Sequence, residues 1–561
     1  MRTALSAAWR RLRDVLPDRA ALTSMTRDPK RDLLSGLTVA LVALPLALGF
    51  GVSTGAGAAA GLATAVVAGA LAAIFGGSNV QVTGPTGAMT VVLVPIVHQH
   101  GIGGVLAVGL LAGLILLALS LARAGALMAY VPVPVIEGFT VGIAGVIALQ
   151  QIPAALGVAT PSGENPAAVA WRAAGEFLSA PHPTAIAVAV GVAAVMLIGA
   201  RLAPLIPASL VAVALATVVV RVFHLPVTLI GPLPDGLPAP NLGFLAWDQL
   251  PSLVLPALAV AALGALESLM SASAADSMSV SARHDPNREL FGQGLANLVA
   301  PIFGGVAATG AIARTAVNVR SGAVSRLSSL THAAVLAAVI YFAGPLVSGI
   351  PLAALAGVLI ATAVRMVEVG SVVTLIRSGR GDALILVLTA AATIAFDLVI
   401  AVITGLLVAA VVAVAQVSRS ARVEQVHLHA DLPEQDHHQE EHALLAEHIA
   451  AYRIEGPLQF AGAHRFLLEL SEVADIRVLI LRMSHVTAID ATGSRVLADT
   501  IDRLDRRGIT VLVSGLNPAH RQRLDTLGLL DRLRGQGRVF GTTPEAIADA
   551  RARLVADGTL T

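Results

Sequence analysis

The chain has 561 residues, of which 56% are hydrophobic and 13% are charged, and its mean hydropathy is +0.79. These values are far more apolar than those of an average soluble protein and argue against a water-soluble enzyme. The formal net charge of +1 gives no reason to expect a nucleic-acid partner.

The absence of cysteine and the near absence of lysine exclude further types of chemistry. The chain has no cysteine, which excludes disulfides, thiolate nucleophiles and Cys-based metal sites. Lys30 is the only lysine, and no G-x-x-x-x-G-K-[ST] loop surrounds it, so a P-loop ATP-driven pump is excluded within this chain. No Ser-His-Asp grouping or zinc ligand set is recognisable. We therefore expect no catalytic residues, no cofactor and no metal, and transport driven by ion gradients, by exchange or by a separate subunit.

The N-terminal segment, residues 1–31, is strongly basic. It precedes a run from Leu33 to Val97 that contains no ionisable side chain. This run is long enough for at least two membrane crossings of roughly 20 residues each. By the positive-inside rule the basic segment stays in the cytosol. We expect a multi-pass protein of the cell inner (plasma) membrane, in contact with membrane lipid.

Apolar stretches recur along residues 32–418, which form the predicted transmembrane transport domain. We count about fourteen stretches, some of them short, and an even number returns the chain to the cytosol. They start near Leu33, Ala58, Thr86, Val105, Val131, Pro183, Pro204, Leu253, Leu290, Thr309, Ser328, Pro351, Ala383 and Ile400.

The composition changes sharply after the last apolar stretch. Residues 419–448 are rich in charged residues and histidine and are predicted to be a solvated linker. Residues 449–561 have the pattern of a small α/β domain, with strands predicted at 452–460, 477–481 and 509–516 and helices at 491–507 and 544–555. The order strand, helix, strand implies a parallel crossover.

A short internal repeat predicts the position of the binding site. The letters FGG at residues 75–77 are followed by TGA at 86–88, and FGG at 303–305 is followed by TGA at 309–311. Each copy joins the end of a second apolar segment to the start of a short third one. Transporters with internal repeats bind substrate near the bilayer midplane, at broken helices whose N-termini point at anionic groups.

Thr86 and Thr309 are predicted to open two such half-helices. The glycines leave backbone NH groups accessible, and the helix dipole adds roughly half a positive charge at each N-terminus. Together these features predict an anion site with few charged side chains. The alternative is that the small residues only permit tight helix packing.

The offset of 223 residues between the two threonines sets Glu267 opposite Leu44, in the middle of an apolar stretch. A charged carboxylate at that depth costs at least about 2.5–3.5 kcal/mol, so Glu267 must be paired, solvated or protonated. Arg314 is the expected counter-charge for a bound anion or for Glu267, provided that it faces the cavity. The alternatives are a structural hydrogen bond for Glu267 and a snorkelling side chain for Arg314.

These residues lie in motifs that resemble the SulP (sulfate permease) family over nearly the whole chain. The motifs are LPLALGFG at 44–51, QVTGPTGAMT at 81–90, ESLMSASAAD at 267–276, RELFGQGLAN at 288–297 and TGAIARTAVN at 309–318. The C-terminal domain, with YRIEGPL from Tyr452 and IDATG from Ile489, resembles a STAS domain.

The resemblance implies an α-helical membrane protein of about fourteen segments, arranged as two inverted repeats of seven and shared with uracil-type carriers. It also implies a mobile core, a gate domain and a homodimer. Glu267 falls on the coupling-ion carboxylate of the family, with Ser271 one turn later. Substrate contacts are implied at Thr86, Gly87, Ala88, Thr309, Gly310, Ala311 and Arg314.

The resemblance further implies a secondary active transporter of small inorganic anions, sulfate or bicarbonate, coupled to H+ or Na+. The N-terminal motifs are closest to the bicarbonate-transporting branch, but Glu267 stands where that branch has Asp, and Arg314 where it has a small residue. Burial favours a protonated carboxyl group, although a nearby arginine favours the carboxylate. We therefore hypothesise proton-coupled symport.

Other functions would also fit these sequence features. A dicarboxylate transporter or an anion channel would fit the same fold, and a nucleobase carrier or an anion sensor are further alternatives. STAS domains resemble anti-sigma factor antagonists that are phosphorylated just after an Asp. Thr492 is the candidate regulatory acceptor, and the alternative is a domain that serves as a scaffold.

Overall fold

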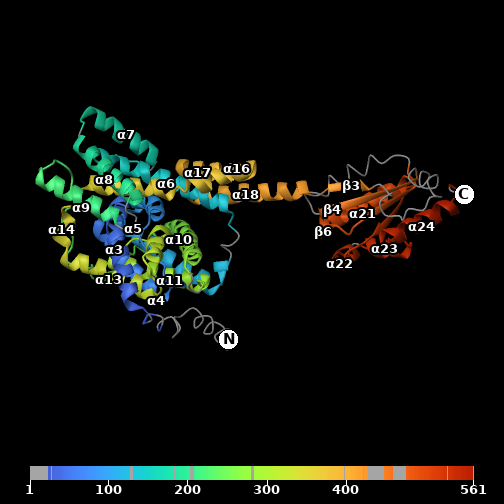
Figure 1. Ribbon diagram of the computed structural model, residues 1–561, viewed down its shortest axis with the longest axis horizontal. Helices are drawn as coiled ribbons and strands as arrows, with labels where there is room; N and C mark the ends of the chain where they lie inside the picture. The colour runs from blue at the N-terminus through green and yellow to red at the C-terminus, as the bar shows by residue number, and fades with distance from the viewer. Residues whose placement is uncertain are drawn as a thin grey trace. The chain divides into compact units, whose positions relative to one another are not determined.

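The computed structural model divides into two compact units, Met1–Leu407 and Val408–Thr561, which we describe separately (Figure 1). The structure describes residues 23, 25, 26, 28–126, 131–163, 165–181, 183–202, 207–279, 283–396, 398–420, 422–426, 448–458, 476–526 and 528–559. The basic segment 1–31 and the linker 419–448 therefore lie largely outside the described residues.

Each of the predicted apolar stretches corresponds to a helix. The stretches near Thr86 and Val105 form one continuous element, α5, which is divided at Gly101 by a backbone conformation that is not helical (φ 68°, ψ −172°). The helices are α3 (Pro29–Ser53), α4 (Ala58–Phe75), α5 (Gly87–Leu121), α6 (Val133–Leu156), α8 (Pro183–Leu202), α9 (Ala208–Val222), α10 (Leu250–Met278), α11 (Pro286–Val299), α12 (Ile312–Arg320), α13 (Arg326–Phe342), α15 (Leu352–Met366), α17 (Arg380–Ala395) and α18 (Leu398–Ser420).

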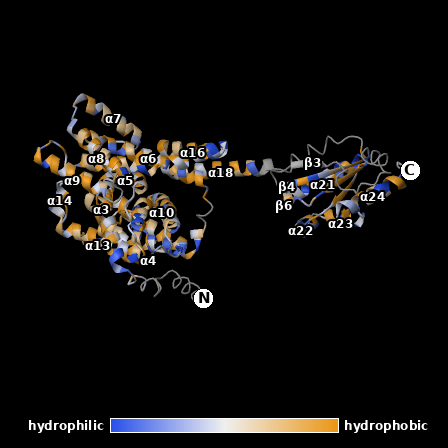
Figure 2. Cartoon of the chain, in the orientation of Figure 1, coloured by the Kyte–Doolittle hydropathy of each residue, from blue (hydrophilic) through white to orange (hydrophobic). Residues whose placement is uncertain are grey.

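Among the described residues, seven helical spans are long and apolar enough to cross a membrane, and several shorter apolar helices accompany them. Figure 2 shows hydrophobic residues throughout these helices. Three helices were not predicted: α7 (Pro166–Ser179), α14 (Gly344–Ser348) and α16 (Val369–Ser378). None of the residues of α16 is buried, and its exposed apolar side chains Val369, Val373 and Ile376 share one face of the helix. Together with α15 it forms one of the seven candidate spans, Leu352–Ser378.

The helices of the first unit pack in two groups. The core group comprises α3, α4, α5, α10, α11, α12 and α13, and the gate group comprises α6, α8, α9, α15 and α17. Contacts within each group are far denser than contacts between them, which fall mainly between α3 and the helices α15 and α9 and between α5 and α6. This grouping is consistent with the division into a core and a gate that the resemblance implies.

Two buried carboxylates bind backbone NH groups where helices of the core group begin or end. Asp32, at the start of α3, accepts hydrogen bonds from the backbone of Val324 and Ser325, just before α13. Glu289 in α11 accepts hydrogen bonds from the backbone of Gly77 and Ser78, just after α4. Backbone NH groups without a helical partner are thereby satisfied, which allows the chain to leave a helix inside the protein.

The second unit contains a six-stranded sheet. Its strands are β3 (Arg422–Val426), β4 (Ile449–Leu458), β5 (Val478–Arg482), β6 (Val486–Ile489), β7 (Thr510–Ser514) and β8 (Val539–Phe540). The order is β3-β4-β5-β7-β8, with β6 on β4; β3 is antiparallel and the other pairings are parallel. The predicted parallel crossover is present, because α21 (Ala491–Arg506) leads into β7 beside β5.

Helices α22 (Pro518–Thr526), α23 (Leu529–Gly535) and α24 (Thr543–Ala556) complete this domain. The apolar face of α21 predicted from the sequence is the buried one, with Leu497, Ile501 and Leu504 in the core and Val496 at its edge. Strand β4 begins three residues earlier than predicted, because Ile449, Ala450 and Ala451 pair with β5.

Candidate functional site

Two short strands bring the starts of two helices together inside the core group. Strand β1 (Thr83–Gly84) precedes α5, and β2 (Thr309–Gly310) precedes α12. The strands pair antiparallel, with Thr83 opposite Gly310 and Gly84 opposite Thr309. Since each half-helix starts within three residues of its strand, the N-termini of α5 and α12 lie close to the same point, as the repeat predicted.

The two half-helices begin differently. Thr86 is the N-cap of α5, and its side chain accepts a hydrogen bond from the backbone of Met89. The N-cap of α12 is Ala311, two residues later than the predicted start at Thr309. The difference arises because Thr309 and Gly310 are held in the strand pairing, and the NH of Ala311 still donates to the carbonyl of Val82.

Glu267 projects from the middle of α10 to both threonines. Its Oε2 accepts hydrogen bonds from the Thr86 hydroxyl at 2.8 Å and from the Thr309 hydroxyl at 2.6 Å. The two hydroxyl oxygens are 3.1 Å apart. Both threonines are buried, so one carboxylate oxygen joins the two half-helix segments in the interior of the core group.

A small cavity of about 50 Å³ lies beside Glu267, between the core and gate groups. Apart from Glu267, Thr140 is the one polar residue among those that line it. The others are Val131, Val135, Ile136, Phe139, Ile143, Leu266, Met270, Ile312 and Met366. The carboxyl group therefore has the threonine pair on one side and a mainly apolar space on another.

Arg314 is buried, at 2% exposure, but it does not bond to Glu267. Its Nη2 donates to the carbonyl of Pro85 at 2.5 Å, and its Nη1 lies so close to Gly84 that a Cβ there would be 2.6 Å away. Arg314 still interacts electrostatically with Glu267. The arginine thus places its charge next to the paired strands β1 and β2 without forming a hydrogen bond to the carboxylate.

Ser271 was expected near Glu267 but contacts a different residue. Its hydroxyl is 3.0 Å from that of Thr315, which accepts a hydrogen bond from the backbone of Val82. Ser271 thereby supports the strand before α5.

The remaining predicted substrate contacts are backbone positions. Gly87, Ala88, Gly310 and Ala311 are all buried around the two helix starts. A Cβ on Gly87 would lie 2.2 Å from Cδ1 of Ile147 in the gate group, so this glycine allows α5 and α6 to approach closely.

Two further polar residues at the site, Ser268 and Gln81, were not predicted from the sequence. The Oγ of Ser268 accepts a hydrogen bond from the NH of Gly310, and Nε2 of Gln81 donates to the carbonyl of Ser268. Neither residue has a distinctive signal in the sequence, because Gln81 lies in a polar loop before β1 and Ser268 lies among other polar residues of α10.

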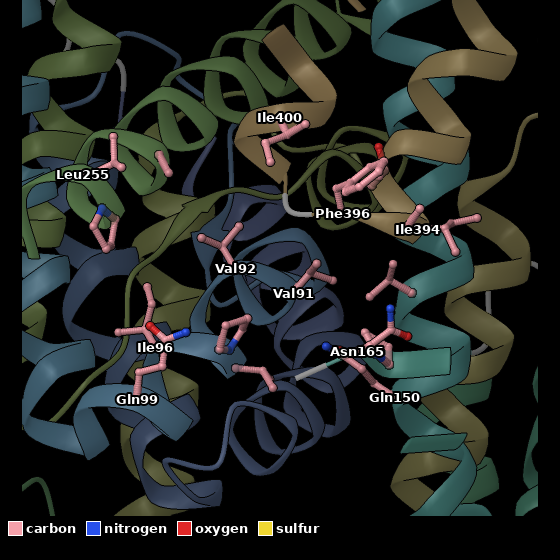
Figure 3. Close-up of a pocket in the computed structure, with 18 residues that line it drawn as sticks. Val91, Val92, Ile96, Gln99, Gln150, Asn165, Leu255, Ile394, Phe396 and Ile400 are labelled. Atoms are coloured by element: carbon pink, nitrogen blue, oxygen red, sulfur yellow. The ribbon is translucent and has the colours of Figure 1, made fainter. Parts of the chain in front are cut away.

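A second cavity, of about 610 Å³, separates the core and gate groups further along α5. Figure 3 shows Val92 and Ile96 of α5 on one side and Gln150 of α6 and Ile394 of α17 on the other. The residues of α5 that follow its N-terminus therefore line this cavity and do not pack against the gate group there.

In the second unit, Thr492 lies exposed in the first turn of α21. The carboxylate of Asp490 caps this helix and accepts a hydrogen bond from Gly493 at 2.6 Å. Ser494, the other hydroxyl after the aspartate, is fully buried. Of the two hydroxyl residues, Thr492 is therefore the exposed one.

Comparisons with known proteins agree with this architecture. Residues 30–389 match the model of the sulfate permease family, and residues 443–546 match that of the STAS domain. The chain is 36% identical to the putative sulfate transporter YvdB of Bacillus subtilis, over 90% of this chain and 94% of that protein. It is 31% identical to the bicarbonate transporter BicA of a Picosynechococcus species, over 90% and 92% of the two chains.

A solved structure, the murine solute carrier 26 family member A9 anion transporter in its inward-facing state, has the same fold. It superposes with a TM-score of 0.83 at 17% identity and covers 96% of this chain and 94% of that one. The chain belongs to the sulfate permease family, with a STAS domain at its C-terminal end, and is a multi-pass membrane transporter of anions, not an enzyme.

Proposed function

We propose that this protein is a secondary active transporter that carries a small inorganic anion, sulfate or bicarbonate, together with a proton by alternating access. The observation that supports it best is the meeting of the α5 and α12 N-termini at the Glu267 carboxyl group.

Helix N-termini favour an anionic ligand for two reasons. Backbone NH groups in the first turn have no partner within the helix, and each dipole places roughly half a positive charge there. Arg314 adds a full charge next to the strand crossing. Two relatives that cover most of the chain are named as sulfate and bicarbonate transporters, which supports these two anions as first candidates.

Glu267 is the proposed carrier of the coupling ion. It is the carboxyl group that contacts both half-helix segments, and the cavity beside it is mainly apolar. A carboxyl group in such surroundings is more stable when it is neutral, which favours a proton as the coupling ion. Sodium is the alternative, since the Glu267 carboxylate and two threonine hydroxyls offer oxygen ligands.

Alternating access requires two bodies that move against each other. The core group carries both half-helices and Glu267, and it meets the gate group through few contacts and across the large cavity. We propose that the core group moves as a unit and carries the bound anion with it.

The assembly and orientation are also part of the proposal. We place the protein in the cell inner (plasma) membrane as a homodimer, with both termini in the cytosol, the N-terminal segment being basic. The domain division proposed is 1–31, 32–418, 419–448 and 449–561. The STAS domain acts as a scaffold or, through Thr492, as a regulator.

Uptake by proteoliposomes tests the function. Labelled sulfate, bicarbonate and a small dicarboxylate are supplied in turn, with an inward proton gradient or an inward sodium gradient imposed separately. We expect uptake of sulfate or bicarbonate that responds to the proton gradient. Sodium dependence without a response to pH would replace the proton by sodium, and uptake of the dicarboxylate alone would change the substrate class. Flux far above the turnover of a carrier would indicate a channel.

A further inference from the structure

The Glu267 carboxylate lies where an oxygen of a bound anion is expected. The hydroxyls of Thr86 and Thr309 both donate to the same atom, Oε2. These residues stand at the starts of the two segments proposed to hold the substrate. A carboxylate oxygen that accepts two hydroxyl hydrogen bonds makes the same interactions as an oxygen of sulfate or bicarbonate at that point.

We infer that the Glu267 carboxylate is an internal competitor of the substrate, which holds the Thr86–Thr309 pair until a proton neutralises it and frees the pair for the anion. The inference rests on the proposed function and deepens it, because it assigns the step that links the proton to the anion.

The count of protons among the three oxygens supports this exchange. The two hydroxyl oxygens and Oε2 form a triangle with sides of 2.8, 2.6 and 3.1 Å. Each hydroxyl can donate one proton and a carboxylate can donate none, so an ionised Glu267 leaves one side of the triangle without a hydrogen bond. A protonated Glu267 can fill all three sides, but as a neutral group it forms hydrogen bonds roughly half as strong as those of a carboxylate.

The cavity beside Glu267 offers a place for the displaced side chain. Its volume of about 50 Å³ is small, and its lining is apolar except for Thr140 and Glu267 itself. A charged carboxylate is strongly disfavoured in such a space, whereas a neutral acid can donate its proton to the Thr140 hydroxyl, which already donates to the carbonyl of Ile136. Only the protonated side chain is therefore expected to leave the threonine pair.

The charged surroundings of Glu267 are simple in the described part of the chain. Arg314 of α12 is the charged group that interacts with it, and Arg314 in turn interacts with His332 of α13. The other helices packed around the carboxyl group contribute Thr86 from α5, Thr140 from α6 and Met366 from α15. When bicarbonate displaces the neutralised carboxyl group, one negative charge remains near Arg314, whereas sulfate leaves two negative charges there, one more than the carboxylate alone.

The consequence is reciprocal linkage between the two ligands. A proton from water binds a carboxylate oxygen of Glu267, and the anion takes the place of that oxygen between the threonines. On the other side of the membrane the anion leaves, the proton returns to water and the carboxylate returns to the threonines. Proton binding must then tighten anion binding by the same factor by which anion binding tightens proton binding.

Equilibrium binding of labelled sulfate to the purified full chain tests the competition. In Glu267→Gln the amide mimics the neutral acid, so we expect sulfate to bind about tenfold more tightly than in the wild type at mildly alkaline pH. We also expect sulfate to bind the wild type more tightly at mildly acidic pH. Sulfate binding by the variant should be independent of pH. Proton-driven accumulation of sulfate should be lost in the variant.

Glu137→Gln is the matched control, because Glu137 accepts a hydrogen bond from Ser371 away from the threonine pair. It should bind sulfate with wild-type affinity and wild-type pH dependence. Equal or weaker sulfate binding by Glu267→Gln, with the pH dependence of the wild type, would overturn the inference.

Infrared difference spectroscopy provides a second readout that does not depend on the variant's stability. Addition of sulfate to the wild type at mildly alkaline pH should produce the carbonyl band of a protonated carboxyl group, and Glu137→Gln should show the same band. Sulfate uptake without this band overturns the competition and leaves the proposed function standing. The band without any uptake supports the competition and removes the transport function.

Discussion

Both half-helix segments contain the sequence Thr-Gly-Ala, but the threonine has a different structural role in each. Thr86 caps α5 with its side chain, whereas Thr309 lies in β2 and α12 starts without a side-chain cap. The Thr86 hydroxyl thus divides its hydrogen bonds between a helix and Glu267, and the Thr309 hydroxyl does not. A repeat in sequence marks equivalent positions, but the strand pairing decides whether the threonine there caps its helix, as Thr86 does, or lies in a strand before it, as Thr309 does.

Substitution of the glycine that follows each threonine is expected to give the largest difference in anion uptake between the two half-helices. A Cβ on Gly310 would lie 1.7 Å from Nε2 of Gln81 and 3.2 Å from Cα of Ser268. Gly310→Ala must therefore break the bond from Gln81 to Ser268 and disturb α10, at a cost of about 1–3 kcal/mol. We expect anion uptake to fall by about tenfold or more.

Gly87→Ala is the matched change in the first half-helix. Its Cβ would meet the end of the Ile147 side chain in the gate group, at 2.2 Å. The added methyl group pushes the core and gate groups apart, so the double variant Gly87→Ala/Ile147→Ala should recover uptake, whereas Gly310→Ala/Ile147→Ala should not. Recovery of both double variants would show that the two glycines are equivalent.

Arg314 has an apolar counterpart, because the repeat offset places Val91 at its position in the first half-helix. Arg314→Met removes the charge next to the strand crossing and leaves the carbonyl of Pro85 without its donor. We expect sulfate affinity to fall about tenfold, with a loss of stability of about 1–3 kcal/mol.

Arg314→Lys separates the two effects, because lysine keeps the charge but not the planar arrangement of donors. It should restore part of the affinity, measured by labelled sulfate binding. Val91→Ala, which changes a residue lining the large cavity, is the control and should bind sulfate normally. Normal affinity of Arg314→Met would remove the arginine from the anion site.

Substitution of the two threonines is expected to give the smallest difference, which is a difference in stability between the two variants. Thr86→Val and Thr309→Val each remove one donor to Glu267, and both should weaken uptake. Thr86→Val also removes the cap of α5, which costs about 1 kcal/mol, whereas α12 loses no cap in Thr309→Val.

Thermal unfolding of the two purified variants measures this difference. The Thr86 variant should unfold at the lower temperature, and Thr86→Ser should restore both stability and uptake. Equal unfolding temperatures would mean that the cap contributes nothing to the stability of the core group.

Much of the architecture followed from the sequence. Apolar stretches separated by Gly and Pro predicted every helix that carries the core and the gate, because in a membrane the backbone must satisfy its own hydrogen bonds. The repeated Thr-Gly-Ala letters located both half-helix starts to within two residues. The buried position of Glu267 marked it as functional, since a carboxyl group at that depth needs a partner.

Contacts between segments that are distant in the sequence could not be predicted from it. The sequence predicted Arg314 as the counter-charge of a bound anion or of Glu267, and Ser271 beside Glu267. In the structure the arginine donates to the carbonyl of Pro85, while still interacting electrostatically with Glu267, and the serine contacts Thr315. Helical spacing sets only the face on which a side chain lies. The partner on that face is decided by the pairing of β1 with β2, which joins residues more than two hundred positions apart and has no local signature.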